Sequence, residues 1–191
     1  RIDFVFMKLL KDILYKVNLD LIHGDSGIGI SHLCFDSREV EKGSLFIALN
    51  GTLSDGHDFI EMAINSGASA IVCEKLPLNI NEAVVYVLVK DSSKALGHIS
   101  ANFYDNPSEK IKLVGVTGTN GKTTVASLLH SLYQSLGHKS GLLSTVVYKI
   151  GSATYEATHT TPDAIRLNGM LREMVDSGCK YCFMEVSSHS V

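Results

Sequence analysis

The stretch that most constrains the fold of this chain is residues 111–124, which read Ile-Lys-Leu-Val-Gly-Val-Thr-Gly-Thr-Asn-Gly-Lys-Thr-Thr. Its apolar beginning is typical of a buried strand, and its glycines and polar residues are typical of a tight loop. Beyond it, apolar residues recur at the spacing of one helical face: Val125, Leu128, Leu129, Leu132, Tyr133 and Leu136. A strand, a glycine-rich loop and a helix in this order predict an α/β layer in which the loop surrounds a phosphate group.

The residue types in this loop suit that chemistry. Backbone N–H groups that all point at one anion leave little space for Cβ atoms, which explains Gly118 and Gly121. Lys122 would reach the β- and γ-phosphates, and the hydroxyl of Thr123 would hold Mg²⁺. The general pattern G-x-x-x-x-G-K-[ST] has a glycine where this chain has Val116. We predict that the loop binds a nucleoside triphosphate, ATP, through Gly118, Thr119, Asn120, Gly121, Lys122, Thr123 and Thr124.

Composition excludes several classes of protein. The 191 residues are 45% hydrophobic and 19% charged, which is ordinary for one large or two small globular domains. With a net charge of −3 and no basic block, nucleic acid is not an expected partner. No apolar run approaches the roughly 20 residues of a membrane span, and the N-terminus lacks the features of a secretory signal. Met7 looks like a natural start, so residues 1–6 are given no role.

The cysteines are Cys34, Cys73, Cys179 and Cys182, and the last two form a C-x-x-C. Such a pair could indicate redox or metal chemistry. However, no second pair accompanies it, and Cys182 runs directly into an apolar segment. We therefore predict buried thiols that pack as small hydrophobic side chains. Reduced cysteines and the use of ATP point to the cytoplasm.

Strands alternating with helices predict an α/β fold with two domains. The first is expected at residues 7–106, with strands at 43–49, 70–73 and 83–89 and helices near 59–67 and 92–104. Pro107 disfavours helical geometry at Asn106, so the boundary is placed there.

The second domain is expected at residues 107–191. Its predicted elements are a helix at 122–136, a hairpin of strands 142–150 and 153–157 around Gly151-Ser152, a helix from Pro162-Asp163 to Gly178, and a strand at 181–186. A doubly wound nucleotide domain normally has more βα units than this, so we interpret the domain as truncated and a further C-terminal domain as absent.

Polar groups cluster at two predicted strand ends. Glu185 lies at the carboxyl end of a strand, where open α/β sheets bind their ligands, and could coordinate Mg²⁺ or be a solvated glutamate. Ser187, Ser188 and His189 follow it, but no G-x-S-x-G elbow supports a Ser–His hydrolase. Thr160-Thr161 precedes a helix and suits either an anionic or sugar ligand or ordinary N-capping. The clusters at 36–38 and 50–57 indicate loops whose ligand their spacing alone does not identify.

At these residues the sequence resembles the Mur ligase family, and within it the MurE branch. The matching segments are Phe-Asp-Ser-Arg (35–38), Gly-Ser-Leu-Phe-Ile-Ala-Leu-Asn-Gly (43–51), Asp-Gly-His-Asp-Phe-Ile (55–60), the loop at 115–124, Thr-Thr-Pro (160–162) and Met-Glu-Val-Ser-Ser-His (184–189). The last segment is the most specific to the MurE branch. The resemblance implies a small N-terminal substrate-binding domain followed by an incomplete ATP-binding domain.

The resemblance also implies roles for single residues. Phe35, Ser37 and Thr52, Leu53 and Ser54 would contact the uridine-diphosphate end of UDP-N-acetylmuramoyl-L-alanyl-D-glutamate. Thr160, Thr161 and Ser187 would contact its muramoyl-dipeptide portion, with a weaker case for His159. Lys122 and Glu185 would be the catalytic pair, with Glu185 and Thr123 on the metal. In the family reaction ATP phosphorylates the D-glutamate side-chain carboxylate, and an incoming amine attacks the acyl phosphate.

Alternatives remain at this stage. The amino acid added could be diaminopimelate or lysine, and the oligomeric state is open. The chain could instead be a non-catalytic UDP-sugar-binding fragment, or part of a MurF-type or folylpolyglutamate-type ligase. Because the family's carbamylated lysine and C-terminal domain would lie beyond Val191, we expect residues 1–191 alone to be inactive.

Overall fold

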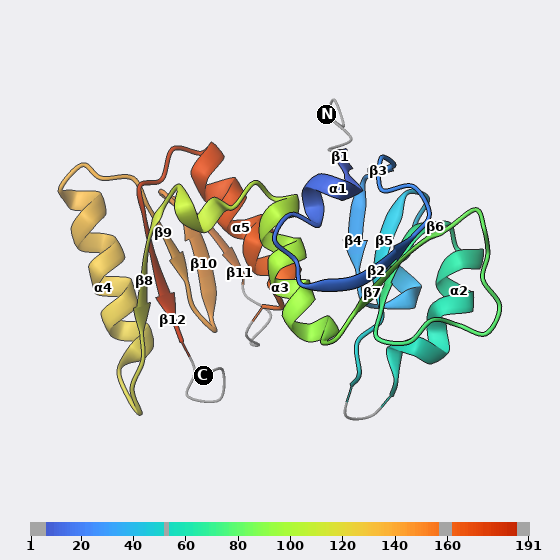
Figure 1. Ribbon diagram of the computed structural model, residues 1–191. Helices are drawn as coiled ribbons and strands as arrows, with labels where there is room; N and C mark the ends of the chain where they lie inside the picture. Colours follow the sequence, from blue (N-terminus) through green and yellow to red (C-terminus); the bar gives the residue numbers. More distant parts are fainter. Residues whose placement is uncertain (1–6, 52–53, 157–161, 187–191) are drawn as a thin grey trace. The chain divides into compact units, whose positions relative to one another are not determined.

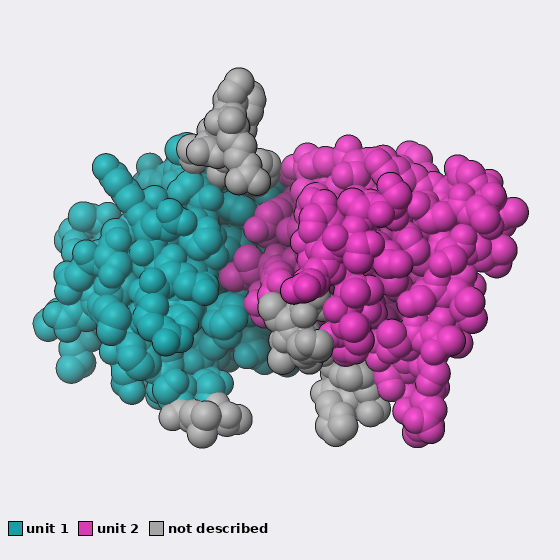
Figure 2. All heavy atoms as spheres, turned by 180° about the vertical axis from the view of Figure 1, so that it is seen from behind, with its two compact units in different colours: residues 1–103 teal, residues 104–191 magenta. Residues whose placement is uncertain are grey.

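The computed structural model describes residues 7–51, 54–156 and 162–186, and the chain divides into two compact units, residues 1–103 and 104–191 (Figures 1 and 2). Each unit has its own five-stranded sheet. The expected boundary at Asn106 lies within the second unit. Asp105 and Asn106 both adopt left-handed backbone geometry, with φ of 61° and 51°, immediately before Pro107. Proline thus excludes Asn106 from the helical region, as the sequence predicts.

The sheet of the first unit is mostly parallel. Its strands are β2 (Leu19–His23), β4 (His32–Cys34), β5 (Ser44–Ile47), β6 (Ala68–Cys73) and β7 (Val85–Val89), in the order β2-β7-β6-β5-β4. Only β2 runs antiparallel to its neighbour, β7. A separate antiparallel pair joins β1 (Lys8–Leu9) to β3 (Gly29–Ile30). The expected strands at 43–49, 70–73 and 83–89 are therefore present, and β2 and β4 are additional.

The strand β5 is buried along its whole length, because helices cover both faces of this sheet. On one face, α2 (Ile60–Asn65) packs over Phe46, Ile71 and Tyr86, which the strand pairing aligns across the sheet. On the other side lie α1 (Leu10–Ile13) and α3 (Ser92–Phe103), which contact each other (Figure 1). Two single turns, η1 (Ser37–Glu39) and η2 (Gly56–Phe59), follow strand ends.

The second unit combines parallel and antiparallel strands. The strands are β8 (Lys112–Val116), β9 (Ser140–Leu143), β10 (Val147–Ile150), β11 (Ala153–Glu156) and β12 (Tyr181–Glu185), in the order β11-β10-β9-β12-β8. The three strands β9, β12 and β8 are parallel, whereas β10 and β11 form the expected antiparallel hairpin around Gly151.

One predicted strand in this unit is wrong. Residues 142–150 form the end of β9 and the whole of β10, with a tight turn between them. In that turn the Ser144 amide donates to the Val147 carbonyl at 3.0 Å, and the Ser144 hydroxyl donates to the same oxygen at 2.8 Å. The serine side chain competes with the strand ladder for backbone groups, which the apolar pattern alone does not indicate.

The helices of this unit cover opposite faces of its sheet. On one face α4 (Lys122–Ser135) packs through Ala126, Leu129 and Tyr133 against Leu142 and Phe183. On the other, α5 (Ala164–Asp176) packs through buried side chains that include Leu171 and Met174. A single turn, η3 (Pro107–Glu109), precedes β8.

The apolar stripe predicted for α4 is wider than the face that the sheet covers. Val125, Leu128, Leu132 and Leu136 are between 45% and 64% exposed. The sequence pattern placed them on the same face as Leu129 and Tyr133. They lie beside that face because β8 is the edge strand, so the described sheet does not extend beneath them.

The cysteine prediction is confirmed. All four thiols are free and buried, and burial raises the pKa of Cys182 to about 12. A thiol held in this state is a weak nucleophile and a poor metal ligand. Across the described ranges, no cluster of three or more His, Cys, Asp or Glu residues could hold a metal ion. No helix in the same ranges is long and apolar enough to cross a membrane.

Candidate functional site

The predicted phosphate loop connects the end of β8 to the start of α4. Gly118 and Gly121 have φ of 146° and 78°, a region that other residues rarely adopt. A Cβ at Gly121 would meet nothing within 4 Å, so backbone conformation, rather than lack of space, requires glycine there. Residues 117–121 are exposed, and no side chain caps the start of α4 at Gly121. The first amides of the helix therefore point into an open loop, as an anion site requires.

Lys122 folds back over this loop. Its Nζ donates to the Gly118 carbonyl at 2.8 Å and remains solvent-accessible. The ammonium group thus lies across the loop that precedes its own helix. A phosphate bound in the loop would offer this ammonium a charged acceptor in place of a neutral carbonyl, which makes a stronger hydrogen bond.

The structure brings Thr123 and Glu185 together. Strands β8 and β12 are parallel neighbours, with Glu185 in register with Val116, so their carboxyl ends meet at one edge of the sheet. The Thr123 hydroxyl donates to Glu185 Oε2 at 2.9 Å. A hydroxyl and a carboxylate are hard oxygen donors of the kind that Mg²⁺ prefers, completed by phosphate oxygens and water.

A third residue at this edge, Thr145, was missed by the sequence analysis. Both its amide and its hydroxyl lie 3.3 Å from Glu185 Oε2. It lies in the turn between β9 and β10, where a continuous strand was predicted. The polar pair Ser144-Thr145 directly after the apolar Leu142-Leu143 was the one sequence signal of a strand end there.

Of the residues predicted to bind the uridine-diphosphate end, Phe35, Ser37 and Ser54 are described, and they follow the carboxyl ends of β4 and β5. Phe35 follows β4 and is partly exposed, whereas Ser37 is buried in η1. Ser54 is exposed in the loop that follows β5. Asp36 caps η1 by accepting from the Arg38 amide at 2.9 Å, and its hydrogen bonds with Arg38 lower the pKa of Asp36 to about 2. This carboxylate therefore stays ionised through the physiological range.

The other predicted site residues lie outside the described part of the chain. They are Thr52, Leu53, His159, Thr160, Thr161, Ser187, Ser188 and His189. Their roles remain predictions from the sequence. Thr119, Asn120 and Thr124 are described, and all three are exposed in or next to the loop.

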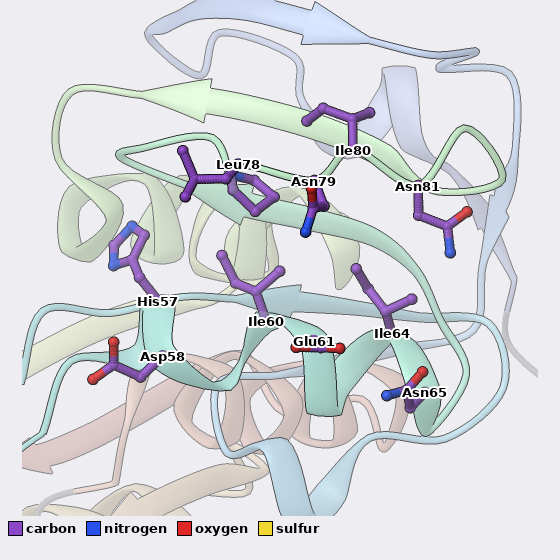
Figure 3. A pocket seen from close by; sticks show the side chains of 11 residues that line it. His57, Asp58, Ile60, Glu61, Ile64, Asn65, Leu78, Asn79, Ile80 and Asn81 are labelled. Carbon is purple, nitrogen blue, oxygen red and sulfur yellow. The ribbon is translucent and has the colours of Figure 1, made fainter.

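A separate cavity of about 420 Å³ lies between α2 and residues 77–81. Ile60 and Ile64 project from α2 toward the segment that carries Leu78 and Ile80, and His57 lies at one end (Figure 3). No lysine or arginine is among the described residues that line it. The cavity therefore lacks the fixed positive charge that suits a nucleotide phosphate.

Comparison with protein families identifies the chain. The Mur ligase middle domain matches residues 116–191, and the model described as the Mur ligase family catalytic domain matches residues 29–104. The chain belongs to the Mur ligase family. The matched regions include the phosphate loop in one unit and the Phe35–Arg38 segment in the other.

Two relatives show how close this Mur ligase chain is to known members. It is 56% identical, over 95% of its length, to the UDP-N-acetylmuramoyl-L-alanyl-D-glutamate--2,6-diaminopimelate ligase of Cytophaga hutchinsonii. It is 50% identical, again over 95% of its length, to the enzyme of the same name from Bacteroides fragilis. The chain spans only 37% and 38% of these two relatives.

Solved structures confirm the expected α/β fold. A UDP-N-acetylmuramoyl-L-alanyl-D-glutamate--2,6-diaminopimelate ligase matches 96% of the chain with a TM-score of 0.74 and 24% identity, and the match covers 36% of that structure. A MurF ligase from Thermotoga maritima, solved in complex with ADP, matches 82% of the chain with a TM-score of 0.54 and 24% identity, and 32% of that structure is covered.

Proposed function

We propose that this chain forms the uridine-nucleotide-binding and ATP-binding parts of an amide ligase of the MurE type. The enzyme would add the third amino acid to UDP-N-acetylmuramoyl-L-alanyl-D-glutamate in peptidoglycan synthesis, in the cytoplasm. The observation that carries the proposal is the Thr123–Glu185 contact of 2.9 Å beside the Lys122 loop. Both relatives compared above are diaminopimelate ligases, which favours diaminopimelate over lysine as the added amino acid.

The chain's own residues fit ATP with Mg²⁺. The left-handed glycines at 118 and 121 and the uncapped start of α4 offer backbone donors to phosphate oxygens. Thr123 and Glu185 would hold Mg²⁺, with Thr145 keeping the Glu185 carboxylate in place. The bound metal would neutralise negative charge on the phosphates during transfer.

The chemistry requires a leaving group on a carboxylate, since a free carboxylate is a poor electrophile. Transfer of the γ-phosphoryl group of ATP to the D-glutamate side-chain carboxylate forms an acyl phosphate and releases ADP. The amine of the incoming amino acid attacks the acyl carbon, and collapse of the tetrahedral intermediate expels inorganic phosphate and forms the amide. Lys122 would stabilise the charge on the transferring phosphoryl group through position and electrostatics.

We propose that substrate binding is divided between two groups of residues. Phe35, Ser37 and residues 52–54 would contact the uridine-diphosphate end at the carboxyl edge of the first sheet. Thr160, Thr161 and Ser187 would contact the muramoyl-dipeptide portion. Support for Phe35, Ser37 and Ser54 is their place after β4 and β5, because open α/β sheets bind ligands at this edge.

The test uses the full-length protein and measures phosphate release that depends on UDP-N-acetylmuramoyl-dipeptide and diaminopimelate. Lys122→Ala should abolish turnover, whereas Lys110→Ala, which changes an exposed lysine of the same unit, should leave it unchanged. Retained activity in Lys122→Ala would refute the loop assignment. Turnover triggered by the muramoyl-tripeptide or by a folate, and not by the dipeptide, would instead identify a MurF-type or folylpolyglutamate-type ligase. Uridine-nucleotide binding without turnover by the full-length protein would support a non-catalytic role.

A further inference from the structure

A polar network connects three neighbouring strand ends of the first unit, and the proposed function does not use it. Asn50 follows β5, Glu74 follows β6 and Ser92 begins α3 after β7. Asn50 Nδ2 donates to Glu74 Oε2 at 2.6 Å. The amide and the hydroxyl of Ser92 both donate to Glu74 Oε1 at 2.8 Å. Each carboxylate oxygen of Glu74 therefore holds a different segment of the sheet edge.

The main chain of Glu74 belongs to the same network. Its amide donates to His57 Nε2 at 2.8 Å, and His57 Nδ1 lies 2.6 Å from Asp55 Oδ1. Because Nε2 accepts a hydrogen bond, the ring proton is on Nδ1 and is donated to Asp55. The imidazole is thus neutral and bridges Asp55 to the backbone of Glu74. The His57 side chain is only 10% exposed, which limits competition from water.

Both ends of the loop that follows β5 are attached to Glu74 in this way. Asn50 and Asp55 face each other in an isolated antiparallel bridge. The Gly51 amide donates to the Ser54 carbonyl at 3.1 Å, and the Gly56 amide to the Leu49 carbonyl at 2.8 Å. The described base of the loop is therefore closed by its own backbone and tied to β6 at Asn50 and, through His57, at Asp55.

This closure depends on a close approach of two backbones. A Cβ at Gly56 would lie 2.7 Å from both the nitrogen and the oxygen of Leu49. Such a contact leaves no space for a larger residue, so this close approach of the loop base to Leu49 requires glycine at position 56. The described base of the loop is therefore preorganised by its hydrogen bonds.

We propose that Glu74 is a positioning residue for uridine-nucleotide binding: its carboxylate, through Asn50, and its backbone amide, through His57, hold the base of the loop after β5 in its binding geometry. This inference rests on the proposed function, because it takes this strand edge as the uridine-nucleotide site. Glu74 need not contact the ligand itself. Without its carboxylate, the Asn50 end of the loop base would have to be ordered at each binding event, and this entropic cost would weaken affinity.

The experiment distinguishes the effect of the Glu74 contact with the loop from the effect of its contact with α3. In the full-length protein, Asn50→Ala removes only the contact to the loop, Ser92→Ala removes only a side-chain contact to α3, and Glu74→Ala removes both. Glu74→Gln keeps the shape and one acceptor oxygen. UDP affinity is measured by calorimetry, KM for the muramoyl-dipeptide substrate and for ATP by kinetics, and exchange of the Gly51 and Gly56 amides by hydrogen–deuterium exchange.

We expect Asn50→Ala and Glu74→Ala to weaken UDP binding by about tenfold, which corresponds to a loss of about 1.4 kcal/mol of binding free energy. KM for the muramoyl substrate should rise with it, whereas KM for ATP and kcat should stay close to the wild-type values. Exchange at Gly51 and Gly56 should accelerate in both variants, less in Glu74→Gln, and not in Ser92→Ala. Equal losses of affinity in Ser92→Ala and Asn50→Ala would assign Glu74 a purely structural role and overturn the inference.

The remaining outcomes also distinguish the two proposals. UDP binding by the wild-type protein that is insensitive to Asn50→Ala and Glu74→Ala refutes the positioning role and leaves the proposed function intact. A wild-type protein that binds no UDP and no muramoyl-dipeptide substrate refutes the proposed function itself.

Discussion

Thr145 offers a quantitative test of the site because only its hydroxyl needs to change. Thr145→Val keeps the shape of the side chain and the backbone amide, and removes one of the donors to Glu185 Oε2. The Thr123 hydroxyl, 2.9 Å from the same oxygen, is unaffected. The variant therefore measures how much the turn between β9 and β10 contributes to holding Glu185, the proposed metal ligand.

The geometry sets the magnitude. A hydrogen bond to a charged acceptor contributes about 1.5–3 kcal/mol. At 3.3 Å this bond is longer than is usual for a hydroxyl donor, and Thr145→Val keeps the amide contact, so we expect the loss to be about 1 kcal/mol. That corresponds to a weakening of Mg²⁺-dependent nucleotide binding by about fivefold. Thr123→Val should weaken it far more, by about a hundredfold, because it removes a proposed metal ligand as well.

The assay is calorimetric titration of the full-length protein with a non-hydrolysable ATP analogue at a series of Mg²⁺ concentrations. Thr145→Ser retains the hydroxyl and should bind like the wild type, and Thr154→Val, an exposed residue of β11, serves as the matched control. Wild-type binding by Thr145→Val would refute the positioning role. Equal weakening in Thr145→Ser and Thr145→Val would attribute the effect to packing of the methyl group rather than to the hydrogen bond.

Three further predictions concern the two units themselves. Asn102 donates to the Ile13 and Tyr15 carbonyls at 2.8 and 2.7 Å, so Asn102→Ala should destabilise the first unit by about 2 kcal/mol. Amide hydrogen exchange measures this loss, and unchanged protection of the amides in the first unit would contradict the prediction. Cys179 and Cys182 should resist thiol reagents until urea unfolds the chain, and rapid labelling of the native protein would show that they are accessible. Burial lowers the pKa of His130 below its ordinary 6.5, so the unfolded chain binds the proton more readily. The free energy of unfolding should therefore fall as the pH drops below about 6.5. This pH dependence should be weaker in His130→Gln, and an unchanged dependence in that variant would argue against the prediction.

The local elements could be predicted from the sequence because their signals are local. The helix after Gly121 begins at Lys122 as predicted, and the helix after Asp163 begins where that side chain accepts from the Arg166 amide at 2.9 Å. The strands in the apolar runs at 68–73 and 181–185 were found for the same reason. Two kinds of exception remain. The strands β2 and β4 were not predicted. In the segment 142–150, a serine that bonds to its own turn divides an otherwise continuous apolar pattern.

The sequence pointed to the residues of one motif and to Glu185 at a strand end, and it missed the contacts between distant residues. The residues from Gly118 to Thr124 are contiguous, so their chemistry follows from their order along the chain. Thr145 was missed because its contact with Glu185 spans 40 residues, and Glu74 because the partners of its carboxylate come from two other strand ends. Periodicity and motif spacing carry no information on such contacts.

The sequence by itself therefore determined the α/β class, the phosphate loop and the Mur ligase resemblance, because backbone conformation and hydrophobic period are properties of neighbouring residues. Tertiary structure alone decided which strands are neighbours. The parallel pairing of β8 with β12 brings the hydroxyl of Thr123 within 2.9 Å of the carboxylate of Glu185. Strand order depends on the packing of whole layers, and it is this order that places distant residues in one site.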